Sequence, residues 1–198
     1  MEGKKVKKLV VILLIVVLLV VVIFAIITIR KVSIFNDLLA KAKESEKITN
    51  YYMEMKQNEG MTTQIWAKDE SHYLMKNVGN DLTMTFYRNG DEELTATEAN
   101  GQKIISSGSG KVLLYTFTNY MNSEDVWQEA VRASVKSVQD SNKECYEIRL
   151  KDVGTILVEK ETGVVLKTET SEISYEINTV TDTDIQKPDL TGYTKLNQ

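Results

Sequence analysis

The pattern of apolar and polar positions divides the chain into one unbroken apolar segment and a longer alternating part. Residues 9–27, LVVILLIVVLLVVVIFAII, are nineteen consecutive apolar residues. With Thr28 and Ile29 added, a helix of this length reaches about 30 Å, the thickness of a bilayer's hydrocarbon core. The run is too long for a secretory signal peptide, and no small-residue cleavage site follows it. We therefore predict a transmembrane anchor over residues 9–29, and favour it over a cleaved signal or a buried soluble helix.

Basic residues flank this segment on both sides. Four lysines precede it, at positions 4, 5, 7 and 8, and Arg30 and Lys31 follow it directly. Charge within about 20 residues of the span is therefore nearly balanced and does not settle the orientation. Because the lysines abut the span and a long following region can cross regardless of its charge, we predict a cytoplasmic head over residues 1–8. The rest of the chain is then extracytoplasmic, on a single-pass protein of the cell membrane.

A helical period follows the apolar segment. Ser33 suits a helix N-cap, and the spacing predicts a juxtamembrane helix over residues 30–48. Its apolar positions on one face are Phe35, Leu38, Leu39 and Ala42. The pattern does not show whether this helix continues the membrane helix or breaks from it.

From Thr49 onward the apolar period becomes two, the period of half-buried β-strands. Thr, Tyr, Ile and Phe are frequent, and turn sequences such as NEG, GND and NGD separate the segments. The predicted strands of this first set are residues 50–57, 61–68, 72–78, 82–88, 93–99 and 102–106. They predict a meander that ends in a flexible linker at SGSG, residues 107–110.

A mid-chain helix separates these strands from a second set. Residues 111–121 fit a helix about as well as a strand, whereas residues 123–135 favour a helix capped by Ser123. Its predicted apolar stripe consists of Val126, Trp127, Ala130 and Val131, with Trp127 as the anchor against the sheet. The predicted strands of the second set are residues 134–140, 143–150, 155–160, 164–171 and 173–180.

Regularly spaced strands with no helices between them are typical of antiparallel sheet. We predict an α+β, mainly antiparallel β domain over residues 49–198. It is expected to be a curved, open (half-barrel) sheet with helices packed in its mouth. The only proline, Pro188, is predicted to end strand pairing, and a turn at Thr191-Gly192 to fold Tyr193 and Leu196 over the sheet edge.

Charge and cysteine content narrow the function classes. Six of the 24 basic and one of the 28 acidic residues precede residue 32, so residues 32–198 carry 18 Lys and Arg against 27 Asp and Glu, a net charge of −9. This charge repels phosphate backbones, and we expect no nucleic-acid partner. The single cysteine, Cys145, excludes an intrachain disulfide and a cysteine metal cluster.

Several phrases of the sequence resemble the LolA/LolB/LppX-type lipoprotein carriers. They are the helix before NYYMEMKQ (50–57), the mid-chain tryptophan helix, and strands joined by ETG (161–163). The ending VTDTDIQKPDLTGY (180–193) is similar to the tail of such domains in Gram-positive bacteria. The resemblance covers about residues 45–195 and implies an unclosed β-barrel with helices in its mouth. Several members carry acyl chains of lipids or lipoproteins, so it also implies an apolar cavity for an amphiphile.

Alternation along the strands supplies candidate lining residues for such a cavity. Methionines and aromatic residues recur on alternate positions, and methionine adapts to ill-defined apolar ligands. The candidates are Tyr51, Met53, Met55, Tyr73, Met75, Leu82, Met84 and Phe86. The same residues equally fit the packed core of a sheet. Trp66 lies off this face and is expected at a rim or on the opposite side.

Catalytic and metal-binding patterns are weak. His72 is the only histidine, and no motif joins it to Cys145. SGSG lacks the Lys-Ser or Lys-Thr of a phosphate loop, and Asp182, Asp184 and Asp189 do not form a calcium-loop pattern. We expect no catalytic residues, metal or cofactor. The sequence thus predicts a binding protein for a lipid, acyl chain or lipoprotein, or alternatively a protein-interaction module; an enzyme is least supported.

Overall fold

The computed structural model describes residues 2–108 and 112–195, with side chains from residue 8 onward. Within these residues, two α-helices, a 3-10 helix and twelve strands follow one another. The helices are α1 (Glu2–Ser45), η1 (Phe117–Asn119) and α2 (Val126–Arg132). The strands are β1 (Tyr51–Gln57), β2 (Thr62–Asp69), β3 (His72–Val78), β4 (Leu82–Asn89), β5 (Glu92–Ala99), β6 (Gln102–Ser106), β7 (Ser134–Asp140), β8 (Lys143–Leu150), β9 (Gly154–Glu159), β10 (Val165–Lys167), β11 (Ser171–Ile177) and β12 (Thr194–Lys195).

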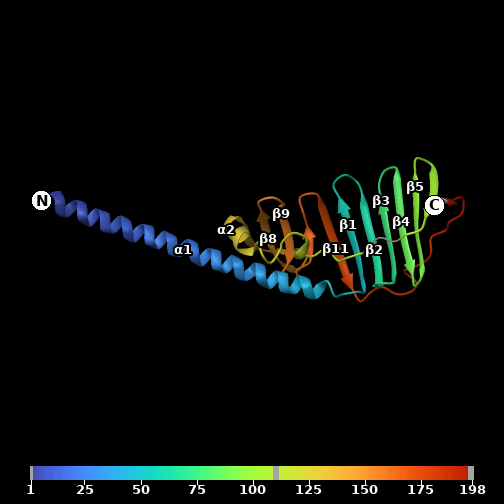
Figure 1. Cartoon of the computed structure of the whole chain (residues 1–198), viewed down its shortest axis with the longest axis horizontal. Coiled ribbons are helices and arrows are strands. Elements are labelled where there is room, and N and C mark those ends of the chain that lie inside the picture. Colours follow the sequence, from blue (N-terminus) through green and yellow to red (C-terminus); the bar gives the residue numbers. More distant parts are fainter. Residues whose placement is uncertain (1, 109–111, 196–198) are drawn as a thin grey trace.

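Helix α1 joins the apolar segment and the juxtamembrane segment without a break. Its 44 residues make it about 66 Å long at 1.5 Å per residue. No proline interrupts it, and Ser33 lies inside the helix instead of capping a new one. The helix is long and apolar enough to cross a membrane, and its N-terminal part extends well beyond the sheet (Figure 1). With no flexible linker, the position of the sheet along the axis of α1 is fixed.

The C-terminal third of α1 packs on the sheet. Phe35, Leu38 and Ala42 have no exposed surface, and Leu39 is 4% exposed, which confirms the predicted apolar face. The Phe35 ring lies 5.7 Å from the Phe117 ring of η1. Polar contacts add to this packing, because Lys41 Nζ donates to the Lys160 carbonyl at 2.8 Å and Ser45 Oγ to the Thr162 carbonyl at 2.7 Å. We call the sheet face under α1 the inner face and the opposite one the outer face.

The two sets of strands form one open sheet of twelve strands, in the order β12-β6-β5-β4-β3-β2-β1-β11-β10-β9-β8-β7. The first set is a meander as predicted, and the second set, predicted as antiparallel sheet, is also a meander. The two sets meet where β1 pairs antiparallel with β11, from Tyr51–Ile177 to Gln57–Ser171. Among the described strands, only β12 and β6 pair in parallel. The mainly antiparallel α+β arrangement is therefore confirmed.

The mid-chain helix differs from its prediction. It has seven residues, because Asp125 stands at its N-cap position and the chain enters β7 at Ser134. Only Val126 and Ala130 of the predicted stripe are buried, while Trp127 is 59% exposed. The prediction that Trp127 anchors this helix on the sheet was wrong. A seven-residue helix packed on a neighbouring helix buries a narrower strip than the sequence pattern offers.

The C-terminal segment after β11 crosses the outer face of the first meander. Its apolar side chains Val180, Ile185, Leu190 and Tyr193 pack on a row of outer-face residues. That row comprises Tyr52, Trp66, Leu74, Tyr87, Leu94, Ala96 and Ile105. Trp66 thus covers the side opposite the inner face. The segment ends as β12, which pairs with the edge strand β6.

Pro188 does not end the last long strand, contrary to prediction. Strand β11 already ends at Ile177, where Asn178 turns the chain with φ 59°. Proline instead lies in the segment that covers the outer face. The predicted folding of Tyr193 over the sheet is confirmed by its packing against the outer-face row. Leu196 and the last two residues of the linker at 107–110 lie outside the described residues.

Substitution Ile185→Ala tests whether the C-terminal segment stabilises the outer face. Ile185 is 6% exposed, so we expect a loss of about 2–4 kcal/mol in the free energy of unfolding. Loosening of the segment should also red-shift Trp66 fluorescence, measured in a Trp127→Phe background. Ile177→Ala is the matched control, because Ile177 is 40% exposed and should lose little. Equal effects of the two substitutions would contradict this assignment.

Candidate functional site

The eight predicted lining residues all lie on the inner face of the first meander. Strand register places Met53 opposite Ile65 on β2, Ile65 opposite Met75 on β3, and Met75 opposite Phe86 on β4. Residues two positions away on each strand share this face. The members of the set are Tyr51, Met53, Met55, Tyr73, Met75, Leu82, Met84 and Phe86. The predicted triplet on β1, pair on β3 and triplet on β4 thus lie on one continuous surface.

Much of this surface is filled by protein side chains. Tyr51, Met53 and Tyr73 are at most 3% exposed and belong to the same cluster as Phe35 and Leu38 of α1. Met55, Met75 and Phe86 are half-buried and pack against the same cluster. Leu82, the first residue of β4, is 39% exposed. Where α1 lies on the sheet, the predicted lining residues are therefore part of the packed core.

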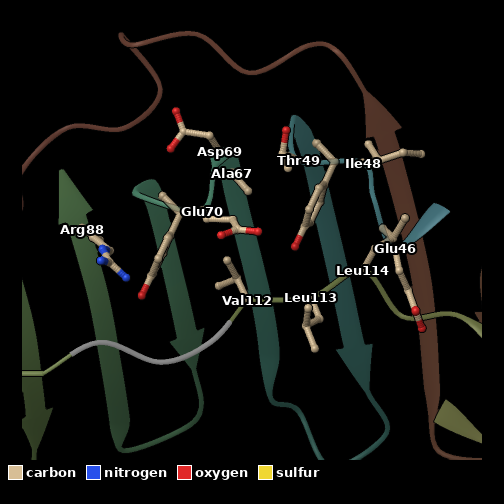
Figure 2. A pocket seen from close by; sticks show the side chains of 12 residues that line it. Glu46, Ile48, Thr49, Ala67, Asp69, Glu70, Arg88, Val112, Leu113 and Leu114 are labelled. Atoms are coloured by element: carbon tan, nitrogen blue, oxygen red, sulfur yellow. The ribbon is translucent and has the colours of Figure 1, made fainter. Parts of the chain in front are cut away.

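A pocket of about 390 Å³ remains beside the end of α1. It lies over the inner face of β1 to β4, and the segment that carries Val112, Leu113 and Leu114 crosses this face, as Figure 2 shows. Its lining residues are Glu46, Ile48, Thr49, Tyr51, Ala67, Asp69, Glu70, Tyr73, Arg88, Val112, Leu113 and Leu114. Of the predicted set, Tyr51 and Tyr73 line it. We call this cavity the inner-face pocket.

A second cavity, of about 360 Å³, contains Met55 and lies between β1, β11 and Tyr115 and Tyr120. This cavity and the inner-face pocket have no lining residue in common. The predicted residues Met53, Met75, Met84, Leu82 and Phe86 line neither cavity.

The charge around the inner-face pocket is predominantly negative. Glu46, Asp69 and Glu70 contribute three carboxylates, and Arg88 is the cation among the lining residues. Arg88 is already paired, since its Nε lies 3.1 Å from Glu93 Oε1 on the neighbouring strand. In Figure 2, Arg88 and Glu46 stand at opposite sides of the pocket. The pocket therefore favours a neutral or cationic group over an anionic one.

Two buried polar atoms of the pocket lining, the Tyr51 hydroxyl and Arg88 Nε, have no hydrogen-bond partner among the described residues. Tyr51 is 3% exposed, and its hydroxyl has no hydrogen-bond partner among the described residues. Burial raises its pKa to about 12, so the hydroxyl stays neutral and keeps its proton. An unpartnered buried hydroxyl costs about 1–3 kcal/mol.

Asp69, Ser71 and His72 lie together at the turn between β2 and β3. Burial favours a higher pKa for Asp69, but hydrogen bonds from His72 and Ser71 outweigh it and lower the pKa to about 2. Ser71 Oγ and Asp69 Oδ1 approach the same imidazole nitrogen, Nδ1 of His72, at 3.2 Å and 2.8 Å. A serine–histidine–aspartate triad needs the serine on the opposite nitrogen. Because the Ser71 amide also donates to Asp69 Oδ1 at 2.8 Å, the cluster is an Asx turn.

Cys145 is not brought near His72. It lies on β8, and five strands separate β8 from β3 in the sheet order. The thiol is fully buried, and burial raises its pKa, so it is poorly suited as a nucleophile. Within residues 2–108 and 112–195, no three His, Cys, Asp or Glu residues are grouped as a metal site would require.

The three aspartates of the C-terminal segment are each engaged locally. Asp182 Oδ1 accepts a hydrogen bond from Lys68 Nζ at 2.6 Å. Asp184 accepts hydrogen bonds from Thr181, and Asp189 from Thr191. They form the surface of a solvated loop.

Sequence reasoning missed Glu46, Arg88 and the residues 112–114. Arg88 shares the alternation of Phe86 and could have been found from it, but a charged residue does not fit an apolar lining. Glu46 and Leu113 come from connections, and their place over the sheet depends on long-range packing that no local pattern encodes. No family model matches the chain, and a search of curated proteins finds no significant relative.

Proposed function

We propose that the protein is a membrane-anchored, extracytoplasmic binding protein that holds an amphiphile in the inner-face pocket. The observation that carries this proposal is a pocket of about 390 Å³ whose lining includes the apolar side chains of Val112, Leu113 and Leu114. This volume falls within the range of about 300–1,000 Å³ typical of small-molecule sites. It suits one short acyl or alkyl chain with its polar head.

The anchor supports a place in the cell membrane with a single pass. The side chains of residues 9–27 are exposed in the structure, as a lipid-facing helix requires. The lysines before it favour a cytoplasmic N-terminus and an extracytoplasmic sheet. The curved sheet with α1 and α2 on it is, in this proposal, a half-barrel of the lipoprotein-carrier type, on the strength of the sequence resemblance.

The distance of the pocket from the membrane determines whether a ligand can still be embedded in the bilayer when it binds. Ser45 is seventeen residues beyond Thr28 along an unbroken helix, a rise of about 26 Å from the end of the apolar segment. A chain still embedded in the bilayer core cannot fill a pocket at that height. The ligand is therefore one that has left the bilayer, which fits a protein that holds or senses cargo.

Ligand chemistry follows from the lining. Each methylene buried in the pocket contributes about 0.8 kcal/mol. Glu46, Asp69 and Glu70 disfavour a carboxylate or phosphate head and favour a neutral or ammonium head.

Fluorescent alkyl probes that differ only in the head group test this proposal. An alkylamine, an alkyl alcohol and a fatty acid of one chain length would be titrated against the full chain in nanodiscs, with empty nanodiscs as the partition control. We expect saturable binding at one site, with the alkylamine at least about tenfold tighter than the fatty acid, which corresponds to about 1.4 kcal/mol. Binding no greater than to empty nanodiscs would refute it.

Leu113→Asp and Leu82→Asp form a matched pair for the same titration. The side chains are 47% and 39% exposed, but only Leu113 lines the inner-face pocket. Leu113→Asp removes apolar lining and should weaken alcohol binding by about tenfold, the equivalent of about two buried methylenes. Leu82→Asp should leave the affinity unchanged, and equal losses would place the ligand elsewhere on the inner face.

A free sheet edge favours a protein-interaction module as the second candidate. Strand β12 covers the β6 edge, but among the described residues no strand pairs with the outer side of β7. Seven residues of unpaired backbone can accept a partner strand. If the alkyl probes fail to bind, this edge is the surface that remains for an envelope partner.

A further inference from the structure

Helix α2 packs on α1 where the apolar segment ends. Thr28 is 5% exposed, although its neighbours Ile27 and Ile29 are 47% and 58% exposed. Lys31 Nζ donates to the Ala133 carbonyl, which follows α2, at 2.6 Å. In Figure 1, α2 lies at the end of the sheet from which the N-terminal part of α1 projects. Helix α2 is thus held level with the first turns beyond the apolar segment.

The exposed face of α2 is apolar. Val126 and Ala130 are buried, at 3% and 0% exposure, and they are one turn apart. Trp127 and Val131, also one turn apart, are 59% and 45% exposed. Residues separated by four positions lie on the same side of a helix, so Trp127 and Val131 form one outward patch. Nothing in the described residues covers this patch.

The depth of the bilayer places the C-terminal end of α2, beside Val131. If the hydrocarbon core begins at Leu9, about 20 residues of helix bring its far boundary to Thr28. The headgroup layer adds about 5–7 Å on that side, which corresponds to about four further residues of α1. Lys31 and the end of α2 that it contacts fall within this layer.

We propose that Trp127 and Val131 insert into the headgroup layer, so that α2 is a second membrane contact beside the transmembrane helix. Tryptophan prefers this layer because its ring is apolar and its indole N–H can donate to lipid carbonyls. Asp125 at the N-cap and Glu129 in α2 offset Arg132, so the contact does not depend on anionic lipid. Zwitterionic phosphatidylcholine is the partner that this chemistry fits.

A second contact has a mechanical consequence. A single helix leaves an attached domain free to tilt by about 20° or more and to rotate about the helix axis. Insertion of α2 would select one tilt and one rotation. The β7 edge and the inner-face pocket would then face fixed directions relative to the membrane surface.

The two tryptophans of the chain provide the test and its internal control. The full chain would be reconstituted in phosphatidylcholine vesicles as Trp66→Phe, which leaves Trp127, and as Trp127→Phe, which leaves Trp66. Trp66 is half-buried, and its ring lies 5.3 Å from the Tyr52 ring on the outer face. Five strands separate its strand β2 from β7, the strand that follows α2. Lipids brominated near the headgroup should lower Trp127 fluorescence by about twofold, as expected for an interfacial ring, and leave Trp66 unchanged.

This inference rests on the proposed anchor, and vesicle flotation separates the two. Protein that floats with the vesicles while Trp127 resists quenching would overturn the α2 contact and leave the anchor intact. Protein that does not float would overturn both. Equal quenching of Trp127 and Trp66 would also overturn the inference, because it would show a domain lying on the membrane without preference for α2.

Discussion

Substitution Gly163→Ala is expected to detach α1 from the sheet and to lower the free energy of unfolding by about 2–5 kcal/mol. Gly163 lies in the ETG turn that precedes β10, with φ 69°. A Cβ there would lie 2.7 Å from the Leu38 carbonyl oxygen and 2.7 Å from the Ala42 amide nitrogen, both backbone atoms of α1. Neither can move without shifting the helix. Urea titration of the full chain in detergent micelles, followed by circular dichroism of the sheet, measures the loss.

Gly101→Ala separates the close approach from the backbone conformation. Gly101 has φ 77°, also in a turn between strands, but an added Cβ would meet no atom within 4 Å. The control should therefore show only the cost of a left-handed alanine, about 1–2 kcal/mol. If both variants lose the same stability, contact between α1 and the turn contributes nothing, and the helix is held by its side chains alone.

Local periodicity predicted those features that depend on one element burying one face. The spacing of Phe35, Leu38 and Ala42 placed all three against the sheet, because a helix docked on a flat surface has only one side to bury. Alternation likewise placed Tyr51 and Tyr73 on the same face, and both line the inner-face pocket.

Features set by competition between elements were not predictable in this way. Residues 134 and 135 satisfied both a helical and a strand pattern, and pairing with β8 decided in favour of the strand. That shortened α2 and turned Trp127 outward. The inner-face pocket needs Glu46, Arg88 and Leu113 together, and these residues come from a helix end, a strand and a crossing segment. Their proximity follows from tertiary packing, which single-sequence patterns do not contain.

Phe35→Ala tests whether the packing of α1 on the inner face stabilises the sheet. Phe35 has no exposed surface, and its ring lies 5.7 Å from that of Phe117, at the centre of the contact between α1 and the inner face. Removing it should cost about 3–5 kcal/mol, because the lost apolar contact leaves a cavity between helix and sheet. The same urea titration in micelles measures the change, and hydrogen exchange of β9 and β10 should rise with it.

Phe24→Ala is the matched control on the same helix. Phe24 lies in the apolar segment and is 54% exposed, so its ring is not packed on the sheet and, in the proposed anchor, would face lipid or detergent. Its removal should leave the unfolding of the sheet unchanged. If Phe24→Ala destabilises the sheet as much as Phe35→Ala, the segment within the membrane and the sheet are coupled along the whole helix. If neither does, the contact at Phe35 does not contribute to the stability of the sheet, and α1 acts only as a tether.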